Sequence, residues 1–156
     1  LCSISAKKGY KIFLLGAMPG VAEKAAGLLR QKYSGLKIVG TYSPSFGFEK
    51  NQEESLEIVN KIQEQKPDII FVGVGSPKQE KWIACYKDRY NVPVSIGVGI
   101  SFDFVAGTVK RAPKIMQKAG LEWLWRLFNE PGRLWRRYLL DDPGFFWLLL
   151  RQKLKK

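Results

Sequence analysis

The chain has 156 residues, of which 46% are hydrophobic and 26% charged, a composition that indicates one globular domain and excludes a disordered polypeptide. It contains 26 Lys and Arg against 14 Asp and Glu, and the formal net charge of +12 at pH 7 favours an anionic partner. Histidine, the commonest general base and metal ligand, is absent from the sequence, which narrows the acid–base and metal chemistry open to it.

Short apolar runs alternate with helical stretches over the first two thirds of the chain. In chain order, we expect a strand at 11–16 and a helix at about 20–33, a strand at 36–42 and a helix at about 51–65, a strand at 68–74 and a helix at 77–90, and a strand at 92–99. The strands lack polar alternation and helices separate them, which predicts a parallel sheet covered on both faces. The predicted fold class is therefore α/β and Rossmann-like.

Spacing within these helices predicts which side chains are buried. One face of the first helix is expected to carry its apolar residues, Val21, Ala25, Leu28 and Leu29. In the third helix, Trp82 is expected to pack rather than to bind a ligand. Cys85 forms no CxxC motif with Cys2, and we expect it to be buried and inert.

Four loops rich in Gly, Ser or Pro follow the predicted strands, at 16–20, 41–47, 73–79 and 97–103. In parallel sheets, ligands collect at the carboxyl ends of the strands, and glycine lets backbone N–H groups approach a phosphate beside a helix N-terminus. Tight turns between strands and helices need glycine in any case, but four such loops on one edge favour a binding site. Neither a dinucleotide fingerprint nor a P-loop is complete, so NAD and ATP are disfavoured while a nucleotide diphosphate held another way stays open.

The sequence changes in character after Gly107. Residues 110–156 hold 12 basic side chains against 4 acidic ones, together with four of the five tryptophans. The six-residue apolar run at 145–150 is too short to cross a bilayer, whereas aromatic and Leu side chains beside Arg and Lys suit helices that lie in the membrane interface. We therefore predict an α/β domain at 1–109 and a helical, membrane-associating appendage at 110–156, with Trp123 and Leu127 packing inward.

Five motifs occur in order along the chain: GVGSPKQEKW at 73–82, GVGISFDFVAG at 97–107, RAP at 111–113, GLEWLWRL at 120–127 and EPGRLWRRY at 130–138. On these motifs, the sequence resembles the WecG/TagA/CpsF glycosyltransferases over nearly its whole length. The resemblance implies an inverting hexosyltransferase that moves N-acetylmannosamine or a related sugar from a UDP-sugar to polyprenyl-diphosphate-linked N-acetylglucosamine. It also implies a peripheral protein at the cytoplasmic face of the bacterial plasma membrane, acting in teichoic acid or cell-surface polysaccharide synthesis.

The same resemblance implies roles for individual residues. Gln79 is expected to be catalytic, its amide bonding sugar or phosphate oxygens on the first helical turn, and Asp103 is expected to bind ribose, with turn formation as its alternative. Glu80 can bond sugar hydroxyls or cap the helix. The other expected substrate-binding residues are Gly16, Gly75, Pro77, Arg111, Arg126, Arg133 and Arg136. The expected membrane contacts are Leu134, Trp135, Tyr138, Leu139, Phe145, Phe146 and Trp147.

The sequence contains no Asp-x-Asp motif, so we expect a reaction without a metal or other cofactor, in which Arg, Lys and helix ends meet the diphosphate charge. Family members carry an N-terminal portion with an Asp proposed as the catalytic base. Nothing before Lys11 supplies this Asp, so the chain is expected to be part of a longer enzyme or a truncated one, and inactive alone.

The alternative function is a non-catalytic basic module that binds anionic membrane or nucleic acid. Nucleic acid is disfavoured as a partner because the aromatics cluster in apolar runs with Leu.

Overall fold

The computed structural model describes residues 1–122, 124 and 125. The chain divides into two compact units, Leu1–Lys110 and Arg111–Lys156.

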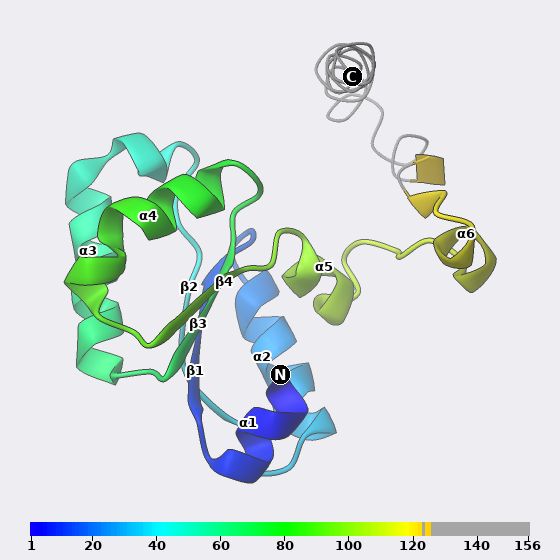
Figure 1. Ribbon diagram of the computed structural model, residues 1–156, viewed down its shortest axis with the longest axis horizontal. Helices are drawn as coiled ribbons and strands as arrows, with labels where there is room; N and C mark the ends of the chain where they lie inside the picture. Colours follow the sequence, from blue (N-terminus) through cyan, green and yellow to red (C-terminus); the bar gives the residue numbers. More distant parts are fainter. Residues whose placement is uncertain (123, 126–156) are drawn as a thin grey trace, which may run out of the picture. The chain divides into compact units, whose positions relative to one another are not determined.

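A four-stranded parallel sheet forms the centre of the first unit (Figure 1). Its strands stand in the order β2-β1-β3-β4, so β1 and β3 are central, and both are buried along nearly their whole length. Burial on both faces is what the uninterrupted apolar runs require. The predicted α/β, Rossmann-like parallel sheet is confirmed. The strand bounds are β1 (Lys11–Gly16), β2 (Lys37–Tyr42), β3 (Ile69–Gly73) and β4 (Val94–Gly97).

Helices cover both faces of this sheet (Figure 1). One face packs against α1, α2 and α5, and the other against α3 and α4. Asn51 begins α3 by accepting a hydrogen bond from the backbone N–H of Glu54, as a side-chain cap does. The helix bounds are α1 (Cys2–Lys8), α2 (Val21–Lys32), α3 (Gln52–Gln65), α4 (Lys78–Tyr90) and α5 (Ser101–Ala106), and a short 3-10 helix, η1 (Phe48–Lys50), precedes α3.

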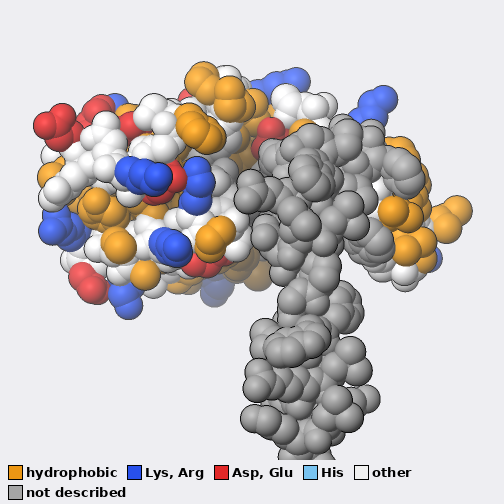
Figure 2. Space-filling model, turned by 90° about the horizontal axis from the view of Figure 1, so that it is seen from above, with side chains coloured by type: hydrophobic (Ala, Val, Ile, Leu, Met, Phe, Trp, Pro, Cys, Tyr) orange, Lys and Arg blue, Asp and Glu red, His pale blue; other side chains and the backbone are white. Residues whose placement is uncertain are grey.

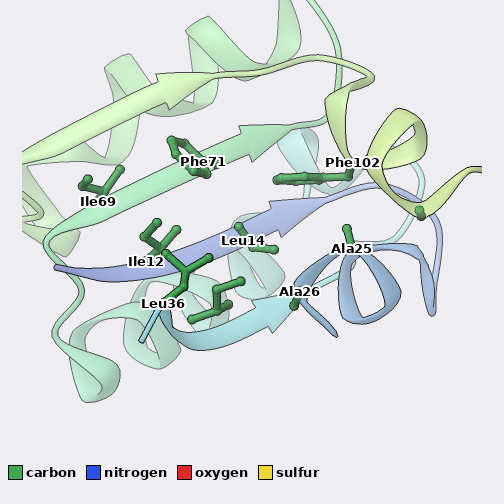
Figure 3. Close-up of a cluster of buried hydrophobic side chains, with 10 residues drawn as sticks. Ile12, Leu14, Ala25, Ala26, Leu36, Ile69, Phe71 and Phe102 are labelled. Atoms are coloured by element: carbon green, nitrogen blue, oxygen red, sulfur yellow. The ribbon is translucent and has the colours of Figure 1, made fainter. Parts of the chain in front are cut away.

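Alternate residues of each central strand enter different layers, because successive side chains of a strand point to opposite faces. Ile12 and Leu14 of β1 lie in the cluster that also holds Phe102 of α5 (Figure 3). Phe13 and Leu15 lie in the opposite cluster, beneath α3 and α4. The sheet is thus packed on both faces, and the loops that connect each strand to the next helix lie at its carboxyl edge.

Trp82 anchors the layer of α3 and α4, as its predicted packing role requires. It is 2% exposed, its Nε1 donates to Ser55 Oγ over 3.3 Å, and its ring stacks on Tyr90 with centroids 5.6 Å apart. Two other expectations for the helices are wrong. Cys85 is exposed, because α4 buries Gln79, Trp82 and Tyr90 instead.

Leu28 of α2 is exposed as well, and the buried face of that helix consists of the alanines Ala22, Ala25 and Ala26. Of the predicted face, Ala25 is buried and Val21 and Leu29 pack against the core, so the prediction fails at Leu28 alone.

In the second unit, the described residues include a short helix, α6 (Lys114–Lys118), which follows Pro113. Gln117 Nε2 donates to the carbonyl of Ala112 over 2.6 Å, and Arg111 Nε lies 3.5 Å from Glu122 Oε1. Among the described helices of the whole chain, none has the length and apolar character needed to span a bilayer. Trp123, Leu127 and all seven residues predicted to contact the membrane lie outside the described part of the chain.

Candidate functional site

The strand order places a topological switch point between β1 and β3. The chain leaves β1 towards β2 through α2 on one face, then returns to β3 on the other side of β1 through α3 on the opposite face. In open α/β sheets, ligands bind outside the carboxyl ends of the strands at such a point. Figure 2 shows one face of the molecule, on which hydrophobic side chains lie interspersed with Lys and Arg.

The two glycines that end β1 and β3 are in direct contact at the switch point. Gly16 has φ +129°, and a Cβ on it would lie 2.5 Å from the carbonyl carbon and oxygen of Gly73. The next residue, Ala17, donates its N–H to the same Gly73 carbonyl over 3.1 Å. Close packing of the two strand ends therefore accounts for Gly16, which was predicted to bind substrate.

Gly75 differs from Gly16 in this respect. It has φ +86°, yet a Cβ on it would meet no atom within 4 Å, so the loop between β3 and α4 is open on that side. Its carbonyl accepts the N–H of Gln79 over 3.0 Å. Pro77 occupies the N-cap position of α4, as expected of a proline at a helix start.

Gln79 lies on the first turn of α4, as predicted, but its side chain is enclosed rather than open to a ligand. It is 6% exposed. Its Oε1 accepts the backbone N–H of Gly99 over 3.0 Å, and its Nε2 donates to Glu80 Oε1 over 2.9 Å. Gln79 therefore joins α4 to the loop that follows β4, and the neighbouring Glu80 is exposed at the surface.

Asp103 lies in the first turn of α5 and is half-buried. Its carboxylate Oδ1 accepts the hydroxyl of Thr108 over 3.2 Å, and its backbone carbonyl accepts the N–H of Thr108 over 3.0 Å. These bonds serve the end of α5, which is the turn-forming alternative. The neighbouring Phe102 ring lies over Gly73, where a Cβ would sit 2.8 Å from the ring, so α5 is held against the switch point.

The loop after β2 adds a feature that the sequence did not single out. The Phe46 side chain is fully exposed, and Lys78 Nζ of α4 lies 4.8 Å from its ring centroid and 2.9 Å from Glu49 Oε1. The hydrogen bond from Lys78 lowers the pKa of Glu49 below its usual range. Glu54 of α3 accepts both the N–H and the hydroxyl of Ser45, which fixes this loop. The sequence signal for this feature was the Phe in SPSFGF, because a Phe in a loop at this edge of the sheet lies outside the hydrophobic core.

The first unit thus brings Gly16, Gly75, Pro77, Gln79, Glu80 and Asp103 to one edge of the sheet. Arg111 belongs to the second unit, and Arg126, Arg133 and Arg136 lie outside the described residues. The edge offers the N-terminus of a 13-residue helix, the cation of Lys78 and exposed or half-buried carboxylates. Such groups suit a ligand that carries both phosphate and hydroxyl groups.

Comparison with known proteins gives concordant matches. The family model described as "Glycosyl transferase WecG/TagA/CpsF family" matches residues 1–156. The chain is 36% identical to an N-acetylglucosaminyldiphosphoundecaprenol N-acetyl-beta-D-mannosaminyltransferase of Bacillus subtilis (strain 168). The alignment extends over 156 residues and covers 100% of this chain and 58% of that protein. The chain is also 37% identical over 145 residues to the protein of the same name from Staphylococcus aureus (strain MRSA252), over 93% of this chain and 54% of the relative. The chain therefore spans less than two thirds of the length of these relatives.

Proposed function

We infer the function from the premise that this chain belongs to the WecG/TagA/CpsF glycosyltransferase family. We propose that it is part of an inverting hexosyltransferase that moves N-acetylmannosamine, or a related sugar, from a UDP-sugar to N-acetylglucosamine on a polyprenyl diphosphate. The names of the relatives support both the transferred sugar and the acceptor. We propose that the product serves teichoic acid or cell-surface polysaccharide synthesis.

The observation that carries the proposal is the convergence of the predicted site residues of the first unit on the carboxyl edge at the β1/β3 switch point. A UDP diphosphate placed there meets the N-terminus of α4 and the Lys78 ammonium, both of which favour negative charge. At Gly75, open space lies where a side chain would begin, which supports a ligand close to this loop. Asp103, nearby on α5, is assigned to the ribose hydroxyls.

In the proposed reaction, the acceptor hydroxyl oxygen attacks the anomeric carbon of the donor sugar and forms the new glycosidic bond. The bond from the anomeric carbon to the diphosphate breaks on the opposite face, UDP leaves with that electron pair, and the hydroxyl proton passes to a base. Negative charge grows on the leaving diphosphate, so cations and backbone N–H groups that contact it lower the barrier. Arg111, Arg126, Arg133 and Arg136 are proposed to meet the diphosphates of donor and acceptor.

The acceptor is a lipid, so its diphosphate lies at the headgroup level of a membrane. We propose that residues 110–156 hold the protein there as a peripheral protein on the cytoplasmic face. The excess of basic over acidic side chains in this segment supports an anionic surface as partner, because each Lys or Arg near such a surface contributes about 1 kcal/mol.

Calorimetry with the purified chain tests the donor half of the proposal. UDP-N-acetylmannosamine and UDP are expected to compete for one site, and ADP and NAD are not. Transfer is then measured as formation of a lipid-linked disaccharide by the protein that carries this chain, with a short-chain polyprenyl diphosphate N-acetylglucosamine as acceptor. A folded chain that ignores UDP-sugars but binds oligonucleotides at matched salt would contradict the proposal in favour of a basic binding module.

A further inference from the structure

We propose that Gln79 is a positioning residue, and that Glu80, which Gln79 orients, is the side chain of α4 that contacts the sugar hydroxyls of the donor. This inference rests on the proposed function and divides its site into a contacting and a supporting residue. It reverses the expectation that the Gln79 amide itself meets the substrate.

The hydrogen bonds of Gln79 fix the orientation of its amide. A backbone N–H such as that of Gly99 can only donate, so the atom 3.0 Å from it is the acceptor Oε1. A carboxylate such as that of Glu80 accepts, so the atom 2.9 Å from it is the donor Nε2. Because the partners lie on opposite sides of the amide, a flipped amide would face a donor with a donor and an acceptor with an acceptor. Gln79 therefore has one stable orientation, which is engaged by the protein.

The backbone of β4 forms the seat for this side chain. A Cβ on Gly97 would lie 2.6 Å from Gln79 Nε2 and 2.9 Å from its Cδ, so the amide rests directly on the end of the strand. With 6% of the residue exposed, most of the Gln79 side chain is covered by the protein. The site is built to hold Gln79 in place rather than to present it.

Glu80 differs from Gln79 in being exposed, and its carboxylate has different hydrogen-bond partners. It occupies the third helical position of α4, where a glutamate ordinarily completes a capping box by accepting the backbone N–H of the N-cap residue. The N-cap of α4 is Pro77, which has no N–H, so a capping box cannot form here. The carboxylate accepts a hydrogen bond from Gln79 Nε2 instead.

An oriented carboxylate suits a polyhydroxylated sugar. A carboxylate can accept several hydrogen bonds at once, so the bond from Gln79 is compatible with further bonds from sugar hydroxyls. Glu80 is exposed on the same first turn that supplies the α4 N-terminus to the diphosphate. A hexose attached to that diphosphate is therefore within the range of neighbouring first-turn groups, and the ligand class is a nucleoside diphosphate hexose.

The test separates sugar recognition from nucleotide binding. Calorimetry gives the ratio of the dissociation constants of UDP and UDP-N-acetylmannosamine for the chain, which measures what the sugar adds to binding. Glu80→Ala and Gln79→Met are each expected to lower this ratio by about tenfold while changing the UDP constant by less than about threefold, the loss of roughly one charge-assisted hydrogen bond. Gln79→Met keeps the side-chain volume and removes both hydrogen bonds.

Two matched variants serve as controls. Gln63→Met removes a glutamine bond of similar length, 2.7 Å to the Arg89 carbonyl, and Glu57→Ala removes an exposed glutamate of an ion pair on α3. Neither is expected to change the ratio. Amide hydrogen exchange supplies a readout independent of ligand. Exchange at Gly99 should rise in Gln79→Met and stay unchanged in Glu80→Ala.

The outcomes distinguish the two proposals. A ratio that falls in Gln79→Met but not in Glu80→Ala would mean that Gln79 contacts the sugar itself, and would overturn the inference. Unchanged Gly99 exchange in Gln79→Met would overturn the supporting role. A folded chain that binds neither ligand would refute the proposed function and the sugar contact together, while the exchange measurement still decides whether Gln79 holds the loop. If Gln79→Met fails to fold, Glu80→Ala alone decides the sugar contact.

Discussion

The ammonium of Lys78 lies 2.9 Å from the carboxylate of Glu49, which joins the first turn of α4 to the 3-10 helix that precedes α3. The hydrogen bond from Lys78 lowers the pKa of Glu49. The carboxylate form is therefore favoured by folding, and its contribution is present above the unfolded pKa of about 4.3 and is lost as pH falls through the lower folded pKa.

From this sign we expect the free energy of unfolding to decline in acid partly through Glu49. Glu49→Gln should flatten the decline below the unfolded pKa of about 4.3, because the neutral amide has no proton to gain. Urea unfolding midpoints at several pH values measure the slope. Glu57→Gln, in the exposed pair with Lys61, is the control. Equal slopes for wild type and Glu49→Gln would contradict the prediction.

Gly16 and Gly75 have different surroundings, so we expect different losses of stability when each is replaced by Ala. Gly16→Ala places a Cβ 2.5 Å from the Gly73 carbonyl, so the ends of β1 and β3 must separate, and we expect loss of folding or a destabilisation above about 3 kcal/mol. Gly75→Ala meets no neighbouring atom and carries only the strain of its positive φ, about 1–2 kcal/mol. Thermal unfolding measures both. Similar costs for the two variants would show that backbone strain, and not contact with Gly73, dominates at Gly16.

Asp103 and Thr108 share a hydrogen bond, which allows the nucleotide role to be separated from the turn role. If Asp103 binds ribose, Asp103→Ala should weaken UDP binding by about tenfold, whereas Thr108→Val should leave it unchanged, because only the first removes a ligand contact. Both remove the shared bond and should lower the thermal midpoint by similar amounts. Should UDP affinity survive in folded Asp103→Ala, the carboxylate serves the turn alone.

The C-terminal segment is predicted to provide the membrane contact. Deleting residues from Leu134 onward is expected to release the protein from anionic liposomes, because it removes seven proposed contacts, Leu134, Trp135, Tyr138, Leu139, Phe145, Phe146 and Trp147. Arg126→Glu, Arg133→Glu or Arg136→Glu should abolish transfer but retain most membrane binding through the aromatics. Co-sedimentation beside circular dichroism checks both. A truncated protein that stays folded and still pellets with liposomes would exclude this anchoring role.

Apolar runs were sufficient to predict the sheet, because β1 and β3 are covered on both faces and leave no room for polar alternation. The three long helices were predicted from the same kind of pattern. The short α1 and α5 were missed, since seven and six residues give too few turns for a periodic signal. The prediction that Cys85 is buried was wrong because it relied on residue type. Burial within α4 depends instead on which of its residues face the sheet.

The sequence predicted the location of the candidate site better than the contacts of its side chains. Strand-end loops identified the edge, because parallel strands bring their carboxyl ends together. The setting of Gln79 could not be predicted, since its burial depends on Gly97 and Gly99, which are close in space but 18 and 20 positions away in sequence. A polar residue on a first helical turn is ordinarily read as solvent-facing, and only the missing Cβ of Gly97 makes room for it inside.

The stacking of Trp82 on Tyr90 and Tyr86 has a spectroscopic consequence. Trp82 is the single indole of residues 1–110, since the other four tryptophans of the chain lie at 123, 125, 135 and 147. Its fluorescence therefore reports on the layer formed by α3 and α4. Replacing Trp82 with Phe would leave an emission that originates wholly from the second unit. The difference between the tryptophan emission of the native chain and that of Trp82→Phe isolates the signal of the sheet domain without any added label.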